Sequence, residues 1–461
     1  MTVDCVIVDA KAITPKGMVE RNIVINDGKI SDFTTDVPSH DKKISAKGLV
    51  AIPGLIDTHV HYGVYSPIEE AAKTESRAAA LGGVTTMMRM LRLGRSYKKY
   101  LQDQLVASKS SHYIDYTIHA TIFDEKQAGE MKYCAENGIT SFKIYMNLGG
   151  EVGHVYMDMD PGSSNLFESQ VQLETSTIRQ VCQNAAQLGC PVLVHAEDYQ
   201  MCECGIKKAK QDHKDGLAAW SQSRPPDSEA KSIKKACEIA REFGTIIYFV
   251  HIGSATALET IEQERKRGTQ IFIETCPHYL TLSYEKQNGY LAKVMPPIRT
   301  TSDNEKIWAA MSSGLIDTIG TDHVANRLKL KVGTDVWSSL AGFPGIGTSL
   351  PILLSEGVNQ NKLNLQQLVH LTSSNAAKIF GMHSKGSLQK GFDADITLID
   401  LKKEQQVSSD FFGSFSDYLV YEGWKLKGWP ITTMVRGKLI TEDMQIVGKL
   451  GHGRLVSRNS K

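Results

Sequence analysis

Six side chains that can bind metal ions stand at the ends of apolar, strand-like runs in this chain of 461 residues. They are His59, His61, Lys143, His195, His251 and Asp322. The alternating His-x-His pair places both imidazoles on one face of a strand, because side chains point to the same face at every second residue. The other four residues arrive on later strands, and they would surround one point if those strands close into a barrel. This is the ligand inventory of a hydrolytic centre with two metal ions.

The hydrophobic pattern predicts the elements that would position these residues. Between about residues 48 and 375, strand-like runs alternate with helix-like segments. The eight strand-like runs are residues 49–61, 84–90, 116–122, 141–146, 190–196, 246–251, 270–275 and 317–322. Eight β-α units predict an α/β fold of the TIM (β/α)8 type, with its active site at the C-terminal ends of the strands. The six candidate ligands all lie toward those ends.

The two ends of the chain have a different, β-rich pattern. Residues 1–52 contain short strand-like pieces joined by turn residues such as Asp27-Gly28, which is typical of half of a small β-sandwich. After Leu388 the chain becomes β-rich again. We predict that the last residues, 455–461, form a disordered tail.

Composition and charge favour a cytoplasmic enzyme that acts on a small molecule. There are 52 Lys and Arg against 51 Asp and Glu, so there is no basic excess of the kind that nucleic-acid binding needs. The first residues do not form the pattern of a signal peptide, and no apolar run is long enough to span a bilayer. The eight cysteines are scattered, which fits reduced thiols. Cys202-Glu203-Cys204 could be interpreted as a metal clip, but the sequence has no second cysteine pair to complete a four-ligand site, so we favour no metal there.

The order and contexts of these motifs resemble the amidohydrolase superfamily and, within it, the cyclic amidases: hydantoinase, dihydropyrimidinase, allantoinase and dihydroorotase. The resemblance spans nearly the whole chain, from PGLIDTHVH at residues 53–61 to SSNAAKIFG at 373–381 and KGFDADITLID at 390–400. It implies that the two terminal regions pair into one sandwich. The expected domains are therefore residues 1–52 as the N-terminal part of the β-sandwich, 53–380 as the metal-dependent barrel, and 381–461 as the C-terminal part of the sandwich with the tail.

The resemblance also assigns roles to the six ligands. His59, His61 and Asp322 would bind the more buried metal ion, and His195 and His251 would bind the second. Neutral imidazoles and a carboxylate suit zinc, with manganese or cobalt as alternatives.

Lys143 is the unusual member, since an ammonium is repelled by a cation. A lone lysine in this place would be interpreted as one that extends to solvent. The SFKIYM context at residues 141–146 matches the family motif, in which the lysine is carboxylated by carbon dioxide and bridges both metals.

The resemblance implies a hydrolytic reaction. A water that bridges two metals is acidified to hydroxide near neutral pH and attacks the amide carbon of a ring. Asp322 would take the proton of the nucleophile and pass it to the leaving nitrogen, as ligand and general acid/base together. His323 follows Asp322 directly, and we expect it to point away from the site.

The sequence departs from the family at the residues that contact substrate. The arginine that dihydroorotases carry after the second histidine is missing, since Tyr62-Gly63 stands there. A tyrosine that follows the lysine motif in hydantoinases aligns with Asn147-Leu148. Met295 and Ala341 replace two further polar family residues. The ring is therefore held differently, or it is not a hydantoin or dihydropyrimidine.

Two features of the chain compensate for these losses in our interpretation. Arg89 and Arg92 fall at the end of the second barrel strand, where an arginine can clamp a carboxylate at two points. The alternative for each is a solvated loop arginine. The segment from about 148 to 170 is polar and rich in glycine, and we interpret it as a mobile loop over the barrel mouth. His154 or Tyr156 could enter the site from this loop and replace the missing tyrosine; the alternative is that these side chains pack locally.

Two classes of function remain. The first is a metal-dependent hydrolase that opens a cyclic amide, with hydantoinase or dihydropyrimidinase ahead of dihydroorotase and then allantoinase. The second is a non-catalytic scaffold like the dihydropyrimidinase-like proteins, which lose metal ligands. All six ligands are present here, which favours the enzyme. By analogy with the family we expect a homo-oligomer, a dimer or tetramer. We interpret the segment around Glu274 and Cys276 as barrel packing.

Overall fold

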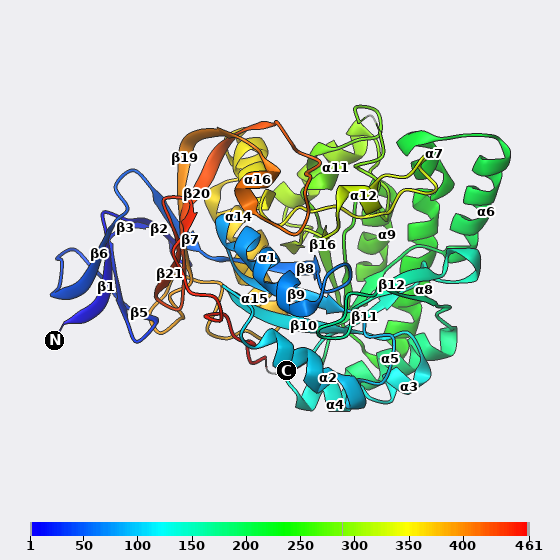
Figure 1. The fold of residues 1–461 in the computed structure, drawn as a ribbon, viewed down its shortest axis with the longest axis horizontal. Helices are drawn as coiled ribbons and strands as arrows, with labels where there is room; N and C mark the ends of the chain where they lie inside the picture. The colour runs from blue at the N-terminus through cyan, green and yellow to red at the C-terminus, as the bar shows by residue number, and fades with distance from the viewer. Residues whose placement is uncertain (1, 288, 459–461) are drawn as a thin grey trace.

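The computed structural model describes residues 2–287 and 289–458. Figure 1 shows a curled sheet surrounded by helices and, to one side of it, two further sheets that contain the N-terminal strands. The curled sheet consists of parallel strands in the order β17-β16-β15-β14-β11-β10-β9-β8-β18. Their bounds are β8 Leu55–His61, β9 Val84–Leu91, β10 Asp115–Thr121, β11 Phe142–Tyr145, β14 Val192–His195, β15 Ile247–Phe249, β16 Ile271–Thr275, β17 Thr318–Ile319 and β18 His323–Val324.

The two edges of this sheet are brought together by one short piece of chain. β17 pairs with β16, whereas β18, which begins only a few residues later, pairs with β8 through the register His323 to Val60. The sheet therefore curls back on itself, as in a TIM-like barrel. Each of the eight predicted strand-like runs contains a strand of this sheet, which confirms their assignment.

The helices lie mainly between successive strands of the curled sheet and cover its outside (Figure 1). They are α1 Ile68–Leu81, α2 Tyr97–Ser108, α3 Glu125–Ala128, α4 Met131–Glu136, α5 Thr175–Gln187, α6 Tyr199–Gln211, α7 Gly216–Ser223, α8 Pro226–Phe243, α9 Ala255–Lys266, α10 His278–Thr281, α11 Thr301–Ser312, α12 Leu328–Lys331, α13 Ser349–Ile352, α14 Leu365–Val369, α15 Asn375–Ile379 and α16 Ser409–Phe412, with η1 Gly150–Val152, η2 Leu353–Val358 and η3 His370–Ser374.

α8 shows how the sequence sets such a helix. Pro226 is its first residue, where a missing N–H costs no hydrogen bond, and Gly244 ends it with a φ of +70°. Ile233, Ala236 and Ala240 lie on its buried face at helical spacing.

The two remaining larger sheets combine strands from both ends of the chain. One sheet has the order β5-β4-β1-β6, and the other has the order β22-β21-β20-β19-β7-β2-β3. Their strands are β1 Val3–Val8, β2 Lys11–Thr14, β3 Gly17–Glu20, β4 Asn22–Asn26, β5 Lys29–Thr34, β6 His40–Ser45, β7 Val50–Pro53, β19 Ile396–Gln406, β20 Lys425–Val435, β21 Lys438–Glu442 and β22 Gln445–Ile446. β19 pairs antiparallel with β7, and Ile7, Ile25, Leu398 and Met434 share one buried core. The domain boundaries at residues 52 and 380 stay predictions.

The prediction of a disordered tail was wrong for residues 455–458, and 459–461 lie outside the described residues. The N–H of Val456 donates to the carbonyl of Tyr116 at 2.8 Å. The guanidinium of Arg458 is buried, and its Nη1 donates to Ser141 Oγ at 2.7 Å. A polar sequence at a chain end does not reveal partners on a distant strand, so the pattern alone suggested disorder.

Removing the Arg458 side chain is expected to destabilise the barrel. In Arg458→Ala, Ser141 loses a charged donor in a buried place, which costs roughly 1–3 kcal/mol and lowers Tm by a few degrees. Arg454→Ala, in the same segment but with an exposed side chain, is the matched control and should leave Tm unchanged. Calorimetry measures the Tm of both variants. Equal Tm values would contradict the structural role of Arg458.

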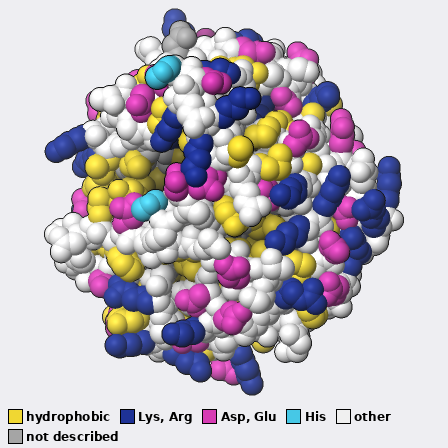
Figure 2. Space-filling model, turned by 90° about the vertical axis from the view of Figure 1, so that its right-hand side faces the viewer, with side chains coloured by type: hydrophobic (Ala, Val, Ile, Leu, Met, Phe, Trp, Pro, Cys, Tyr) yellow, Lys and Arg dark blue, Asp and Glu magenta, His cyan; other side chains and the backbone are white. Residues whose placement is uncertain are grey.

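Neither charge dominates the face of the molecule that Figure 2 presents. Figure 2 shows basic and acidic side chains mixed over the face in view, with apolar side chains between them. No helix within the described residues combines the length and the apolar character that crossing a membrane requires.

Candidate metal centre and active-site cavity

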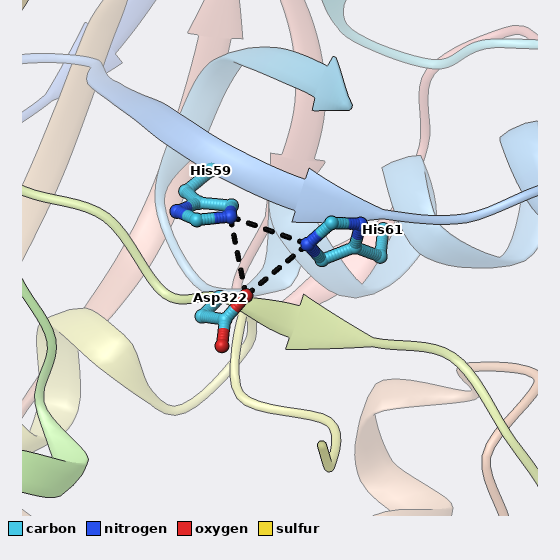
Figure 3. Close-up of side chains that lie close together, drawn as sticks. All are labelled: His59, His61 and Asp322. Carbon is cyan, nitrogen blue, oxygen red and sulfur yellow. Dashed lines mark hydrogen bonds and ion pairs between the residues drawn. The ribbon is translucent and has the colours of Figure 1, made fainter. Parts of the chain in front are cut away.

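Three of the predicted ligands converge at one end of the curled sheet. His59 and His61 stand at the end of β8, and Asp322 lies in the short link between β17 and β18 (Figure 3). The Nε2 atoms of the two histidines are 3.2 Å apart, and each lies 3.2 Å from Asp322 Oδ1. All three side chains are buried.

The chain fixes this arrangement through hydrogen bonds to Asp57, at the middle of β8. The carboxylate of Asp57 accepts from the N–H of Thr321 at 3.0 Å, from its hydroxyl at 2.6 Å and from the N–H of His59 at 3.1 Å. The residue before Asp322 is thus tied to the strand that carries the histidines. Asp322 itself has a φ of +49° and His251 one of +45°. Side chains other than glycine adopt this left-handed region at a cost, which is typical of functional sites.

His195 and His251 complete the cluster from β14 and the end of β15. Their ring centroids are 4.5 Å apart, and the ring of His251 lies 5.3 Å from that of His59. His195 Nε2 donates to Glu197 Oε2 at 2.7 Å, and the Arg224 guanidinium donates to the same oxygen at 2.6 Å. This bond leaves Nδ1 of His195 as its free ligand atom.

Lys143 lies on β11 beside these histidines and is completely buried. Its Nζ has no hydrogen-bond partner within the described residues. Desolvation lowers the pKa of this amine from its ordinary range to about 7. A buried lysine without a partner is costly for a protein, so its presence calls for a function.

The residues fit a bound divalent metal. His59 Nδ1 lies 2.8 Å from a carboxylate oxygen of Glu274 and donates to it, so the lone pair of its Nε2 points at His61 and Asp322. Burial holds the pKa of both His59 and His61 well below the ordinary value, which favours the neutral imidazole. Two imidazole nitrogens and a carboxylate oxygen that converge in a buried place are the donors that zinc-like ions prefer.

A cavity of about 100 Å³ opens next to this cluster. His61, His195, His251 and Asp322 line it, and so do the predicted substrate contacts Arg92, Asn147 and Met295. His323 points elsewhere as expected, since its Nε2 is 2.8 Å from Glu75 Oε2.

Two other predicted contacts are not at the cavity. Arg89 is buried, and its guanidinium donates to Asp158 Oδ1 at 2.7 Å and to the carbonyl of Tyr62 at 3.0 Å. The prediction that Arg89 clamps a substrate was wrong, because residue 89 shares the outward face of β9 with Met87 and Leu91.

Tyr156 also lies away from the lining of the cavity. Its ring packs against Tyr65 with the centroids 5.6 Å apart. His154 reaches the rim of the cavity, but its side chain is largely exposed and lies 3.3 Å from Glu168.

The segment predicted as a mobile loop is a β-hairpin that lies over the cavity. β12 (His154–Met157) pairs antiparallel with β13 (Phe167–Gln170). Met157 is buried, and Asp158 directly after it forms the buried ion pair with Arg89. The hydrogen-bonded strands and this ion pair give the segment regular structure that its polar, glycine-rich sequence did not suggest.

The sequence reasoning missed the carboxylates that orient the ligands. The interpretation of Glu274 as barrel packing was wrong, because this side chain accepts hydrogen bonds from His59 and from the hydroxyls of Thr58 and Tyr248. Glu197, which holds His195, could have been found from its position two residues later in the HAE motif. Tyr145, on the same face of β11 as Lys143, also lines the cavity and was not singled out.

Comparison with known proteins agrees with this geometry. The model of the amidohydrolase family matches residues 50–440. A D-hydantoinase of Geobacillus stearothermophilus is 31% identical over 97% of this chain and 94% of its own length. An allantoinase of Solibacter usitatus is 29% identical over 97% of this chain and 96% of its own length. A crystal structure of D-hydantoinase aligns with a TM-score of 0.89 at 29% identity, over 100% of this chain and 99% of that one. Because the family model matches most of the chain and the D-hydantoinase is 31% identical over nearly its whole length, the chain belongs to the amidohydrolase family.

Proposed function

We propose that this amidohydrolase opens a cyclic amide ring of the hydantoin or dihydropyrimidine type by hydrolysis. The observation that carries the proposal is the convergence of His59, His61 and Asp322 to 3.2 Å at the mouth of the curled sheet. The relatives support the ring chemistry, since they are named hydantoinases and allantoinases.

Two divalent metal ions, zinc by the donor set, would be held by six residues. His59, His61 and Asp322 would hold one ion, and His195 and His251 the other. The pair of ions supplies acidification of water and polarisation of the ring carbonyl. Lys143 would bridge them as an N6-carboxylated side chain. Its buried, unpartnered Nζ supports this role, because an uncharged amine is the form that combines with carbon dioxide.

Asp322 would move the proton during ring opening. Its carboxylate lies at the cavity wall, where it can accept a proton from the attacking water and donate it to the leaving ring nitrogen. Burial raises the pKa of this carboxyl above its ordinary value. Glu274 and Glu197 keep His59 and His195 in the orientation that presents the ligand nitrogen to the cluster.

The proposal includes the finer predictions about architecture and setting. The curled sheet would be a (β/α)8 barrel in which β17 and β18 are the halves of the eighth strand, spanning residues 53–380, and the terminal regions would form the sandwich. The protein would work in the cytoplasm as a homo-oligomer. A scaffold without activity is disfavoured, because the residues that such proteins lose are all present.

Turnover of the zinc-loaded protein on dihydrouracil, hydantoin, allantoin and dihydroorotate, measured side by side, tests the function. We expect hydantoin, dihydrouracil or its carboxylated form, dihydroorotate, to be opened with a higher kcat/KM than allantoin. Preference for allantoin would replace the proposal by the allantoinase alternative. If the metal-loaded protein opens none of the four rings, the proposed function is wrong.

A further inference from the structure

The cavity beside the ligand cluster contains a cationic side chain that no carboxylate neutralises. Arg92 lines the cavity with His61 and Asp322. Across residues 2–287 and 289–458, no Asp or Glu oxygen lies within 4.0 Å of its guanidinium. Its Nε is buried and has no hydrogen-bond acceptor among these described residues. Arg92 is half-buried, and leaving its buried Nε–H without an acceptor is costly, so a ligand that supplies an acceptor would bind there favourably.

Asp158 explains why the side chain of Arg92 stays free. One oxygen of this carboxylate accepts from Arg89 at 2.7 Å, and the other accepts from the backbone N–H of Arg92. The N–H of Asp158 in turn donates to the carbonyl of Arg92 at 2.9 Å. The backbone of Arg92 is thus fixed in place while the neighbouring acid is fully engaged by other donors.

The electrostatics of the cavity also favour an anion. Asp322 is the one carboxylate among the described residues that line it, and it belongs to the ligand cluster. Arg92 is the one lysine or arginine in that lining. A bound divalent cation would add further positive charge, and in a narrow, buried space such charges attract an anionic group strongly.

Two further polar atoms of the cavity wall lack partners. Lys143 and Tyr145 lie on the same face of β11, and Asn147 in the turn after this strand lines the cavity together with Tyr145. Tyr145 Oη and Asn147 Oδ1 are both buried without a hydrogen-bond partner among the described residues. A hydroxyl can donate to a carbonyl, and an amide oxygen can accept from an N–H, and a cyclic amide offers both groups.

We propose that the ring bound in this cavity carries an anionic substituent, a carboxylate, which Arg92 binds at two points. Tyr145 donates to a ring carbonyl, and Asn147 accepts from a ring N–H. The inference rests on the proposed function and names its substrate class. Arg92 is a specificity-determining residue here, and the planar fork of its guanidinium matches the two oxygens of a carboxylate.

Substrate pairs that differ by the acidic group test this inference. The first pair is dihydrouracil and dihydroorotate, which is dihydrouracil with a carboxylate at position 6. The second pair is hydantoin and hydantoin-5-acetate. We expect the wild-type enzyme to have the higher kcat/KM for the carboxylated member of at least one pair. Arg92→Ala should lower that value by roughly 10- to 100-fold, mainly through KM, because a hydrogen bond to a charged group is lost. The kcat/KM of the same variant for the neutral substrate of the pair should change by less than about threefold.

Three further variants sharpen the comparison. Arg92→Lys keeps the positive charge but lacks the planar fork of the guanidinium. Its decrease in kcat/KM for the carboxylated substrate should therefore lie between those of the wild type and of Arg92→Ala. Arg92→Gln is closer in size to arginine and should reproduce the selective loss, which guards against misfolding of the alanine variant. Arg95→Ala removes a nearby guanidinium that pairs with Asp160 and does not line the cavity. It should leave kcat/KM unchanged for both substrates of a pair.

The outcomes separate this inference from the proposed function. Equal losses on both members of a pair, in variants with wild-type metal content, would overturn the role of Arg92. A wild-type enzyme that opens the neutral rings faster than both acidic ones would overturn the substrate class and leave the proposed function standing. Failure to open any ring would remove the proposed function and this inference with it.

Discussion

Lys143→Ala is expected to abolish ring opening and to lower the metal content of the purified protein. Lys143 Nζ is buried next to His195 and His251 with no partner among the described residues, and the proposed carboxylated form is the group that would join the two metal positions. Its loss removes several kcal/mol of stabilisation of the transition state, which corresponds to a decrease in kcat/KM of about 10³-fold or more. Metal analysis and turnover on the same sample measure both effects.

A chemical rescue distinguishes a bridging carboxylate from a merely structural lysine. The alanine variant leaves space where a short carboxylic acid can enter, so added acetate or propionate should restore part of the activity and of the metal content. An alanine variant that keeps wild-type activity and metal content would exclude the bridging role. Mass spectrometry of the native protein, at a pH that preserves the carbamate, should show the added mass of carbon dioxide.

Asp322→Asn is expected to reduce kcat by roughly 10²- to 10⁴-fold, the range typical for loss of a general acid/base. The amide oxygen can still approach a metal, but it cannot carry the proton from the nucleophile to the leaving nitrogen. Asp317→Asn is the matched control, because Asp317 lies on the same stretch of chain, pairs with Arg265 at 2.6 Å and does not line the cavity.

Both variants should be assayed in excess zinc, so that weaker metal binding is separated from loss of proton transfer. Retention of wild-type kcat by the asparagine variant under these conditions would exclude Asp322 as the acid/base. A similar loss in the Asp317 variant would instead indicate a general effect on the fold.

The ligands and the barrel strands could be predicted from the sequence because their signals are local. The alternation of His59 and His61 fixes their common face, and each later ligand ends its own apolar run. The pairing of β19 with β7 joins residues almost 350 positions apart, and the family resemblance rather than any local pattern suggested it.

The remaining errors concern features that tertiary contacts determine, namely the direction of a side chain and the structure of the hairpin. All residues of β9 are buried, so its apolar sequence does not show which face looks inward. Arg89 therefore looked equivalent to Arg92, although Met88 and Met90 mark the inward face that Arg92 continues. The ion pair of Arg89 with Asp158 also determines the base of the hairpin, and a single sequence gives no sign of a contact between residues so far apart.

Titration of the metal-free protein with zinc, followed by ring opening of hydantoin, dihydrouracil and their carboxylated partners, tests the central claim most directly. The account predicts no activity without metal and an activity that rises until two zinc ions are bound per chain. Ring opening that persists after complete removal of metal would contradict it, as would a protein with two zinc ions that opens none of these rings.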